Sequence, residues 1–354
     1  MGIIPGTLEM CQRFSPSQCR VLCYNMCMSE LRIALIGCGG MGMRLGCALN
    51  ALEDARIAVC CDIDEDRAAT AVSELSADEM ILDYRTALSN PGVDGVIIAT
   101  PNNLHAPMAI DAARAGKHIF TEKPMALSVA DCDAMIAAAR DAGVKLMVGQ
   151  VLRYIGQFAK AKQIIDSGEL GKPFSIGIER VSQSAVRDGW RARKADNGGM
   201  LYEVHVHELD YMAYLLGEPT TCYAQSGHYG DNTYDFDDEL FAIYRFRNGA
   251  VSSLHASFCS SMDRYHGKIL CEKGAIFFGH TAGEVMIKRG SADPEALDIS
   301  DVPNPHEREL GEFLDAIRTG SEPRITGAEA RRAIGMAQAA DLSAETGQVV
   351  ALPL

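Results

Sequence analysis

The spacing of glycines after the first apolar segment constrains the fold of this chain more than any other feature. Residues 31–36 are apolar and predict a β-strand, and Gly37, Gly39 and Gly42 follow it before a helical run. In such a strand–turn–helix unit the first glycine permits a tight turn. The second lets a pyrophosphate approach the backbone, and the third lets helix and strand pack closely. We therefore expect a dinucleotide at the helix N-terminus, in contact with Gly37, Gly39, Gly40 and Met41.

Strands and helices continue to alternate up to about residue 150. Short apolar runs predict strands at Arg56–Cys61, Val93–Ala99, His118–Thr121 and Val144–Val148. Helical periodicity separates them over Asp66–Leu75, Leu104–Ala115 and Ser128–Ala142. This alternation is typical of a doubly wound parallel sheet, so the N-terminal half is predicted to be a Rossmann domain.

The pattern changes after residue 150. Helices are predicted at Ile155–Ser167, Gly199–Leu216, His306–Arg318 and Gly327–Thr346. Between the second and third of them lie six strand-like segments joined by tight turns: Thr221–His228, Glu239–Arg247, Val251–Phe258, Gly267–Cys271, Ala275–Gly279 and Glu284–Lys288. We expect an α+β domain with a large, open, mostly antiparallel sheet. The predicted division is an extension at 1–28, a Rossmann domain at 29–150 and a substrate-binding and oligomerisation domain at 151–354.

Charge and cysteine content exclude several classes of partner. The chain carries 47 acidic and 33 basic residues, a net charge of −14, which disfavours nucleic acid as a partner. No apolar run approaches the ~20 residues that span a bilayer. Four of the twelve cysteines, Cys11, Cys19, Cys23 and Cys27, fall in the first 28 residues, which we expect to be poorly ordered. A metal site there lacks the usual paired C-x-x-C units, and the other eight cysteines suit a reduced, cytoplasmic protein.

An acidic residue after the second strand indicates which dinucleotide binds. Asp62 stands about where a carboxylate accepts hydrogen bonds from both ribose hydroxyls and repels a 2′-phosphate, and Ile63 adjoins it. This favours NAD over NADP. Arg67 lies close to Asp62 along the chain and could bind a 2′-phosphate, so NADP remains the alternative cofactor.

Two further stretches carry the chemistry. Thr100-Pro101-Asn102 with His105, and Ala115-Gly116-Lys117-His118 leading to Glu122-Lys123-Pro124, both follow strands of the parallel sheet. Gly198-Gly199 precedes a helix that contains His207 and Asp210. With the glycine turn, Arg153, the Trp190-Arg191 pair and Leu310–Pro323, these motifs resemble the glucose-fructose oxidoreductase / inositol dehydrogenase / MocA (Gfo/Idh/MocA) family. The resemblance runs from Leu31 to Leu354.

This resemblance implies an NAD-dependent oxidation of a secondary hydroxyl on a sugar, sugar derivative or cyclitol. Lys123 would hydrogen-bond the hydroxyl, His207 would take its proton, and Glu203, four residues earlier on the same helix, would orient His207. The remaining roles implied are cofactor binding by Thr100, Pro101, Asn102, His105, Glu122 and Lys123, and substrate binding by Arg153, Tyr154, Trp190, Arg191, His207 and Asp210. No metal is expected.

Two departures from the family pattern leave questions open. Glu203 stands where the family usually has Asp, so its carboxylate either contacts His207 or points at the substrate. His205 stands where the family has a small residue, and its side chain is either packed in the core, exposed at the surface or close to the site. The least expected alternative is a metal site formed by Glu203, His205, His207 and Asp210. Three further residues each have two possible roles. Arg153 either faces the cleft or forms an interdomain ion pair, and Trp190 either stacks on a sugar ring or packs against protein. Asp210 is either a substrate ligand or an acidic residue on the helix surface.

Two other functions fit the same motifs. A hydrolase or lyase could oxidise a sugar transiently with retained NAD, and a sensor could bind NAD and sugar without catalysis. The open sheet face predicts a homo-dimer or homo-tetramer, as in relatives. Specificity is expected in the loops Ser182–Lys194 and Ser257–Tyr265, whose sequences do not identify the substrate.

Overall fold

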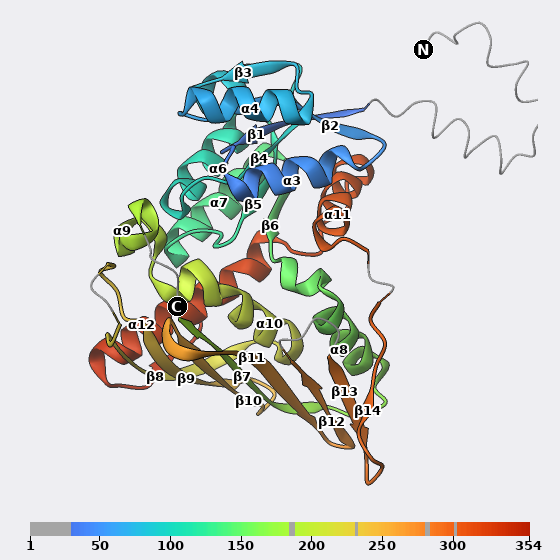
Figure 1. The fold of residues 1–354 in the computed structure, drawn as a ribbon, viewed down its shortest axis with the longest axis vertical. Helices are drawn as coiled ribbons and strands as arrows, with labels where there is room; N and C mark the ends of the chain where they lie inside the picture. The colour runs from blue at the N-terminus through green and yellow to red at the C-terminus, as the bar shows by residue number, and fades with distance from the viewer. Residues whose placement is uncertain (1–29, 184–187, 231–232, 280–283, 301–302) are drawn as a thin grey trace, which may run out of the picture.

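Six parallel strands build the N-terminal half, in the spatial order β3-β2-β1-β4-β5-β6 (Figure 1). The computed structural model describes residues 30–183, 188–230, 233–279, 284–300 and 303–354, so the predicted extension and its four cysteines lie outside the described residues. The strands are β1 (Leu31–Ile36), β2 (Ala55–Cys61), β3 (Glu79–Ile81), β4 (Gly95–Ile98), β5 (His118–Glu122) and β6 (Leu146–Gly149).

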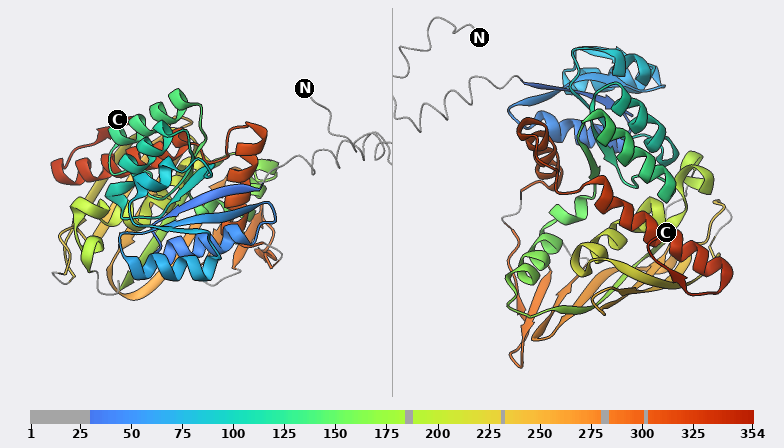
Figure 2. Two further views of the ribbon diagram at one scale, coloured as in Figure 1. Left: turned by 90° about the horizontal axis from the view of Figure 1, so that it is seen from above. Right: turned by 180° about the vertical axis from the view of Figure 1, so that it is seen from behind.

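Helices cover both faces of this parallel sheet (Figure 2). On one face lie α3 (Gly40–Asn50) and α4 (Glu65–Leu75), and on the other α6 (His105–Arg114) and α7 (Val129–Ala142). The short α5 (Tyr84–Ser89) connects β3 to β4. The strands are buried on both sides, which is why they are near-continuous apolar runs. The predicted doubly wound Rossmann domain is confirmed.

The C-terminal half contains a nine-stranded sheet in the order β14-β13-β12-β11-β7-β10-β9-β8-β15. Only β7 and β10 pair in parallel, so the sheet is mostly antiparallel, as predicted. Its strands are β7 (Pro173–Gln183), β8 (Pro219–Gly227), β9 (Glu239–Phe246), β10 (Val251–Ser257), β11 (Cys259–Cys271), β12 (Gly274–Phe278), β13 (Val285–Arg289), β14 (Glu295–Ala296) and β15 (Val350–Ala351).

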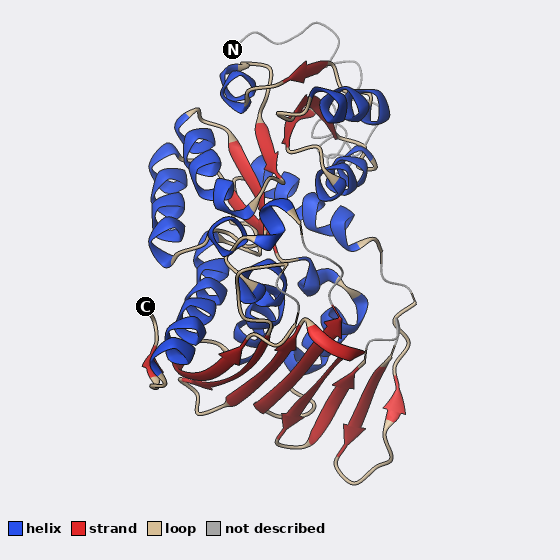
Figure 3. Ribbon diagram, turned by 60° about the vertical axis from the view of Figure 1, so that its left-hand side comes forward, coloured by secondary structure: helices blue, strands red, loops and turns tan. Residues whose placement is uncertain are grey.

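Three helices lie between the two sheets: α8 (Gly156–Ser167), α10 (Val206–Leu216) and α12 (Gly327–Thr346) (Figure 3). They cover one face of the nine-stranded sheet. No helix of the described part covers the other face, where Phe241 and Ile243 are 56% and 57% exposed.

Two strands differ from the sequence-based expectation. The central strand β7 was missed, because its apolar residues Phe174, Ile176, Ile178 and Val181 are separated by polar residues and glycine. The following strand β11 begins at Cys259, eight residues earlier than predicted, because it pairs with β7. The expected specificity loop Ser257–Tyr265 is therefore largely strand. In the other loop, residues 184–187 lie outside the described residues.

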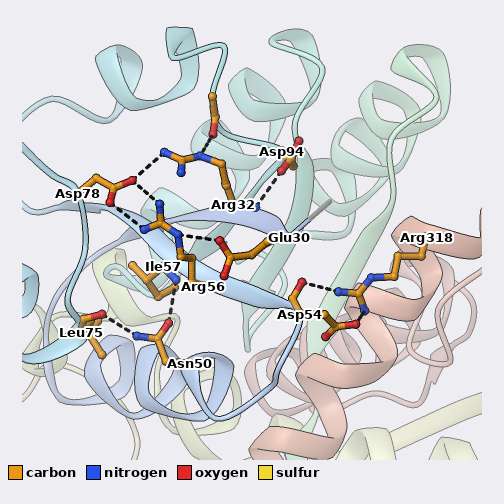
Figure 4. A network of polar contacts seen from close by, with 11 residues as sticks. Glu30, Arg32, Asn50, Asp54, Arg56, Ile57, Leu75, Asp78, Asp94 and Arg318 are labelled. Atoms are coloured by element: carbon orange, nitrogen blue, oxygen red, sulfur yellow. Dashed lines mark hydrogen bonds and ion pairs between the residues drawn. The ribbon is translucent and has the colours of Figure 1, made fainter. Parts of the chain in front are cut away.

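Helix α11 (Pro305–Thr319) returns from the second half to pack on the first. The rings of Phe313 and Phe120 meet edge to face with centroids 5.8 Å apart. At its C-terminal end Arg318 binds the Asp54 carboxylate at 2.8 Å and the Asp54 carbonyl oxygen at 2.7 Å (Figure 4). The last third of the chain thus fixes the position of the two sheets relative to each other.

Two findings bear on the expected location of the protein. None of the helices in the described residues is long and apolar enough to cross a membrane. All eight cysteines of the described part are free thiols, and six of them are buried.

Candidate active site

The glycine turn has the geometry that a pyrophosphate requires. Gly37 has a φ of +94°, and a Cβ there would lie 2.5 Å from the Ala99 carbonyl oxygen. A Cβ on Gly42 would lie 1.9 Å from the Gly37 carbonyl oxygen, which shows how closely helix and strand approach. No atom lies within 4 Å of a Cβ built on Gly39 or Gly40, so the first turn of α3 presents open space beside free N–H groups. These residues fit a dinucleotide.

The Asp62 carboxylate, at the end of β2, is oriented by two backbone hydrogen bonds. Its Oδ2 accepts a hydrogen bond from the Cys38 N–H at 2.8 Å, and its Oδ1 accepts one from the Asp64 N–H at 3.0 Å. The neighbouring Ile63 is 94% exposed, as expected of a residue that lies along a bound ligand. Arg67 pairs with Asp64 at 3.4 Å on the surface. The arrangement fits the two ribose hydroxyls of NAD.

Lys123 lies just past β5 and reaches across to the second half of the chain. Its Nζ donates to the Glu203 carbonyl oxygen at 2.8 Å. The preceding residue, Glu122, is buried and accepts the Lys123 backbone N–H at 3.1 Å. Burial raises the pKa of Glu122 to about 7, and the Lys123 charge opposes that rise. The lysine is therefore positioned by contacts from both halves.

The helical segment that carries His207 begins with a turn of π-helix over Leu201–His205, and α10 follows. Single π-helical turns are frequent at functional sites. His207 is buried, and its Nδ1 lies 3.1 Å from Oε1 of Gln150. Burial and then the nearby charge of Lys123 hold the pKa of His207 well below 6.5. His207 is therefore neutral at pH 7.

Glu203 does not have the partner that its spacing predicted. Its Oε2 accepts from Asn102 Nδ2 at 2.9 Å and its Oε1 from Arg191 Nε at 3.3 Å. The described residues contain no hydrogen bond between Glu203 and His207. The expected contact assumed α-helical geometry, and the π-helical turn that contains Glu203 removes this assumption. The structure thus corrects the orienting role of Glu203.

Two predicted cofactor ligands brace the site instead. The His105 ring lies between two carbonyl oxygens, Pro124 at 2.8 Å from Nδ1 and Thr100 at 3.0 Å from Nε2. Burial lowers the pKa of His105. Asn102 Nδ2 donates to the Asn197 carbonyl oxygen as well as to Glu203. Both side chains bind protein atoms and so hold this loop in shape, and cofactor binding by them stays a prediction. Thr100 and Pro101 lie on that same loop.

Three predicted substrate ligands form ion pairs and hydrogen bonds within the predicted C-terminal domain. Arg153 donates to both Asp210 oxygens at 2.8 and 2.7 Å and to Glu329, and all of its Asp210 contacts are buried. The Tyr154 hydroxyl donates to Glu312 at 2.7 Å. Arg153 lines a cavity of about 750 Å³, and neither Lys123 nor His207 is among the residues that line this cavity. In the structure the polar atoms of Arg153, Tyr154 and Asp210 bind protein partners, and substrate binding by these residues stays a prediction.

Trp190 and Arg191 lie on a 3-10 turn over Gly189–Ala192 at the surface beside the site. The Arg191 guanidinium lies 4.7 Å from the Trp190 ring centre, and its side chain is 55% exposed. Since Arg191 also pairs with Glu203, this turn is linked to the helix that carries His207.

His205 is buried, with Nδ1 3.3 Å from Glu208 Oε2 and its ring beside Phe258. Glu208 also accepts from Arg180 at 2.9 Å and from Tyr265 at 2.7 Å. Although burial opposes it, the Arg180 charge holds the pKa of Glu208 below its usual range. Within the described residues no group of three or more His, Cys, Asp or Glu side chains could hold a metal ion.

Sequence motifs did not indicate Gln150, Asn197 or the contacts of Glu208. Gln150 directly follows β6, at the carboxyl end of a parallel strand, where ligands bind in such sheets. That position was the available signal. Asn197 and Glu208 become visible only when the halves are brought together.

Comparisons with known proteins agree with this geometry. The model of an oxidoreductase family with an NAD-binding Rossmann fold matches residues 31–150, and the model of the Gfo/Idh/MocA C-terminal domain matches 158–277. The 2,7-anhydro-N-acetylneuraminate hydratase of Escherichia coli (strain K12) is 33% identical over 265 residues, 73% of this chain and 70% of the relative. The scyllo-inositol 2-dehydrogenase (NAD(+)) of Bacillus subtilis (strain 168) is 29% identical over 336 residues, 91% of this chain and 96% of the relative.

A solved structure of levoglucosan dehydrogenase in complex with NADH and L-sorbose superposes with a TM-score of 0.86 and 26% identity. The match covers 92% of this chain and all of that one. The fold agrees with these matches, and the chain belongs to the Gfo/Idh/MocA family of NAD-dependent oxidoreductases.

Proposed function

We propose that the protein oxidises a secondary hydroxyl of a sugar, sugar derivative or cyclitol, with NAD as the acceptor. The observation that carries this proposal is that Lys123, from the first half of the chain, binds the helical segment that holds His207: its Nζ donates to the Glu203 carbonyl oxygen at 2.8 Å. Burial, and after it the Lys123 charge, lowers the pKa of His207. Relatives named for inositol and levoglucosan oxidation support the substrate class.

The two side chains divide the work on the hydroxyl. Lys123, a donor without acceptor capacity, holds the hydroxyl oxygen and stabilises negative charge that develops on it. His207, neutral at pH 7, accepts the hydroxyl proton at a ring nitrogen. When bound, NAD supplies the acceptor for the hydride that leaves the carbon. Loss of the O–H proton and the C–H hydride leaves a carbonyl group, so the step balances.

A second reaction uses the same groups. The relative in Escherichia coli is named a hydratase of an anhydro sugar, which favours a lyase or hydrolase. Such an enzyme would oxidise its substrate with bound NAD, eliminate a substituent, and reduce the intermediate again with the NADH formed. In that case NADH is not released. A non-catalytic sensor is disfavoured because Lys123 and His207 are both present and brought together.

We also propose a homo-oligomer formed through the open face of the nine-stranded sheet. Tyr223, Phe241 and Ile243 are exposed on this face, while alternate residues Ala224, Ala242 and Tyr244 are buried on the other. A second copy of the chain would cover them. The eight free cysteines of the described part suit a reducing compartment, which supports the cytoplasm as the location.

The experiment that tests the proposed reaction is a screen of purified protein with NAD against sugars, cyclitols, anhydro sugars and glycosides. NADH formation is followed by absorbance, and substrate consumption by chromatography. NADH formed in proportion to substrate consumed supports the dehydrogenase. Consumption without net NADH supports the lyase or hydrolase.

A further inference from the structure

We propose that Gln150 is the positioning residue of His207: its amide oxygen fixes the tautomer that leaves Nε2 free as the base. This inference rests on the proposed function of His207 and adds the residue that orients it. The contact is the 3.1 Å separation between Gln150 Oε1 and His207 Nδ1, in a region where both residues are buried.

The chemistry of the two groups decides where the imidazole proton lies. A neutral imidazole has one N–H, and an amide oxygen can only accept a hydrogen bond. With Oε1 facing Nδ1, the proton must therefore reside on Nδ1. His207 Nε2 has no hydrogen-bond partner among the described residues, so it remains an available acceptor.

The backbone holds Gln150 in place. It immediately follows β6 and caps the 3-10 turn Val151–Tyr154. Its own N–H donates to the Val148 carbonyl oxygen at 2.9 Å, and its carbonyl oxygen accepts the Arg153 N–H at 3.1 Å. Arg153 is in turn locked by Asp210. Since the Gln150 side chain is also buried, it has little freedom to turn away from His207.

The expected orienting group is engaged elsewhere, because the Glu203 carboxylate binds Asn102 and Arg191. The difference between an amide and a carboxylate matters for the base. A carboxylate beside Nδ1 would stabilise the imidazolium and raise the pKa of His207, whereas an amide adds no charge. The other charged or titratable groups that face His207 are Lys123 after β5, Arg180 on β7, and His205 and Glu208 on its own helical segment.

The orientation of the Gln150 amide determines which histidine tautomer is present. In the structure its Oε1 faces His207 Nδ1, and its Nε2 group is buried with no partner among the described residues. If the amide were turned over, its N–H would face Nδ1 and His207 would carry its proton on Nε2. That tautomer could not accept a proton at Nε2. The two orientations therefore predict opposite histidine tautomers.

The first test reads the tautomer directly and does not depend on turnover. Long-range 15N–1H NMR of the full-length, histidine-labelled protein, with His207→Asn used to assign the signal, should show Nδ1–H for His207. A His207 signal of the Nε2–H form would overturn the proposal. If no sugar is oxidised, the proposed function fails, yet this measurement still decides the role of Gln150.

The second test compares Gln150→Glu with Gln150→Met. The glutamate keeps an acceptor and adds charge, so the acid limb of the kcat/KM profile should move to higher pH by about one unit. The methionine keeps the size and removes the acceptor, so kcat should fall about 10- to 100-fold while substrate KM changes less than about threefold. If Gln150 had only a structural role, the acid limb of the kcat/KM profile of both variants would lie at the same pH as in the parent protein. The proposal would be contradicted if the acid limb of Gln150→Glu did not move and the kcat of Gln150→Met was unchanged.

Discussion

Lys123 Nζ donates a 2.8 Å hydrogen bond to the backbone carbonyl oxygen of Glu203, and this bond joins the two halves of the chain at the site. The acceptor is main-chain, so it is present whatever side chain stands at position 203. Glu203, which stands where the family usually has Asp, therefore does not change the position of Lys123. Its own carboxylate instead ties the Asn102 loop to Arg191.

Replacing Lys123 by Met should abolish oxidation and leave NAD affinity nearly unchanged. The substitution keeps the length and removes the only charged donor assigned to the hydroxyl. We expect a loss of activity of about 100-fold or more, in the range of positioned acid–base groups. NADH formation and NAD binding by fluorescence titration provide the two readings. An active Lys123→Met enzyme would remove this lysine from the mechanism.

The oxidation rate should persist into mildly acidic solution. The base must be neutral to accept a proton, and burial and Lys123 hold the pKa of His207 well below 6.5. The rate then falls only when the pH drops below that lowered value. A kcat/KM profile measures the limb, and Glu122→Gln serves as the control because the pKa of Glu122 is about 7. An acid limb above pH 6.5 in both proteins would contradict the assignment.

Cofactor selectivity should depend on Asp62. With Ser in its place the repulsion of a 2′-phosphate is lost, and so is one acceptor for the ribose hydroxyls. We expect the preference for NAD over NADP to narrow by about 10-fold or more, since each 1.4 kcal/mol is a factor of ten. Steady-state constants with both cofactors measure this preference. An unchanged ratio would show that the discrimination lies elsewhere.

Asp210 should matter for stability. Substitution by Asn leaves the buried Arg153 charge without its main partner, and breaking such pairs costs about 3–5 kcal/mol. The surface pair Asp133–Arg331 offers a matched control, because Asp133→Asn should cost about 0–1 kcal/mol. Denaturant unfolding of the two variants gives the comparison. Equal losses of stability would show that the buried network is not structurally important.

The open sheet face should hold the oligomer together. Charged substitution of its two most exposed residues on β9, Phe241→Glu with Ile243→Glu, should dissociate the assembly, because carboxylates would be buried unpaired in the interface. Light scattering after size exclusion measures the mass. A parent protein that is monomeric at micromolar concentration would contradict the proposed assembly, and an unchanged mass in the double variant would place the interface elsewhere.

The sequence predicted most of the fold because its strands and helices alternate with clear periods. The glycine turn indicated the cofactor end, and strands such as β1 and β4 carried clear apolar patterns. Strand β7 was missed because its identity comes from pairing with β10 and β11 and not from its own composition. A central strand with polar residues facing an open face has little local signal.

The sequence indicated which residues lie near the site better than it indicated which residues contact one another. Lys123 binds the main chain of the helical segment that holds His207, whereas Glu203, Arg153 and Asp210 have partners that only tertiary structure reveals. Helical spacing predicted a Glu203–His207 contact because it assumed an uninterrupted α-helix. Gln150 could not be found from spacing, since it meets His207 across 57 residues of chain.

The central claim is that the protein removes a hydride from a secondary carbinol carbon and releases NADH. The most direct measurement is the ratio of NADH formed to sugar or cyclitol consumed by the purified protein supplied with NAD, with His207→Asn as the inactive control. We predict one NADH for each substrate molecule oxidised and a carbonyl product at the same position. Substrate consumed with no net NADH, or equal turnover by the His207→Asn variant, would contradict the account.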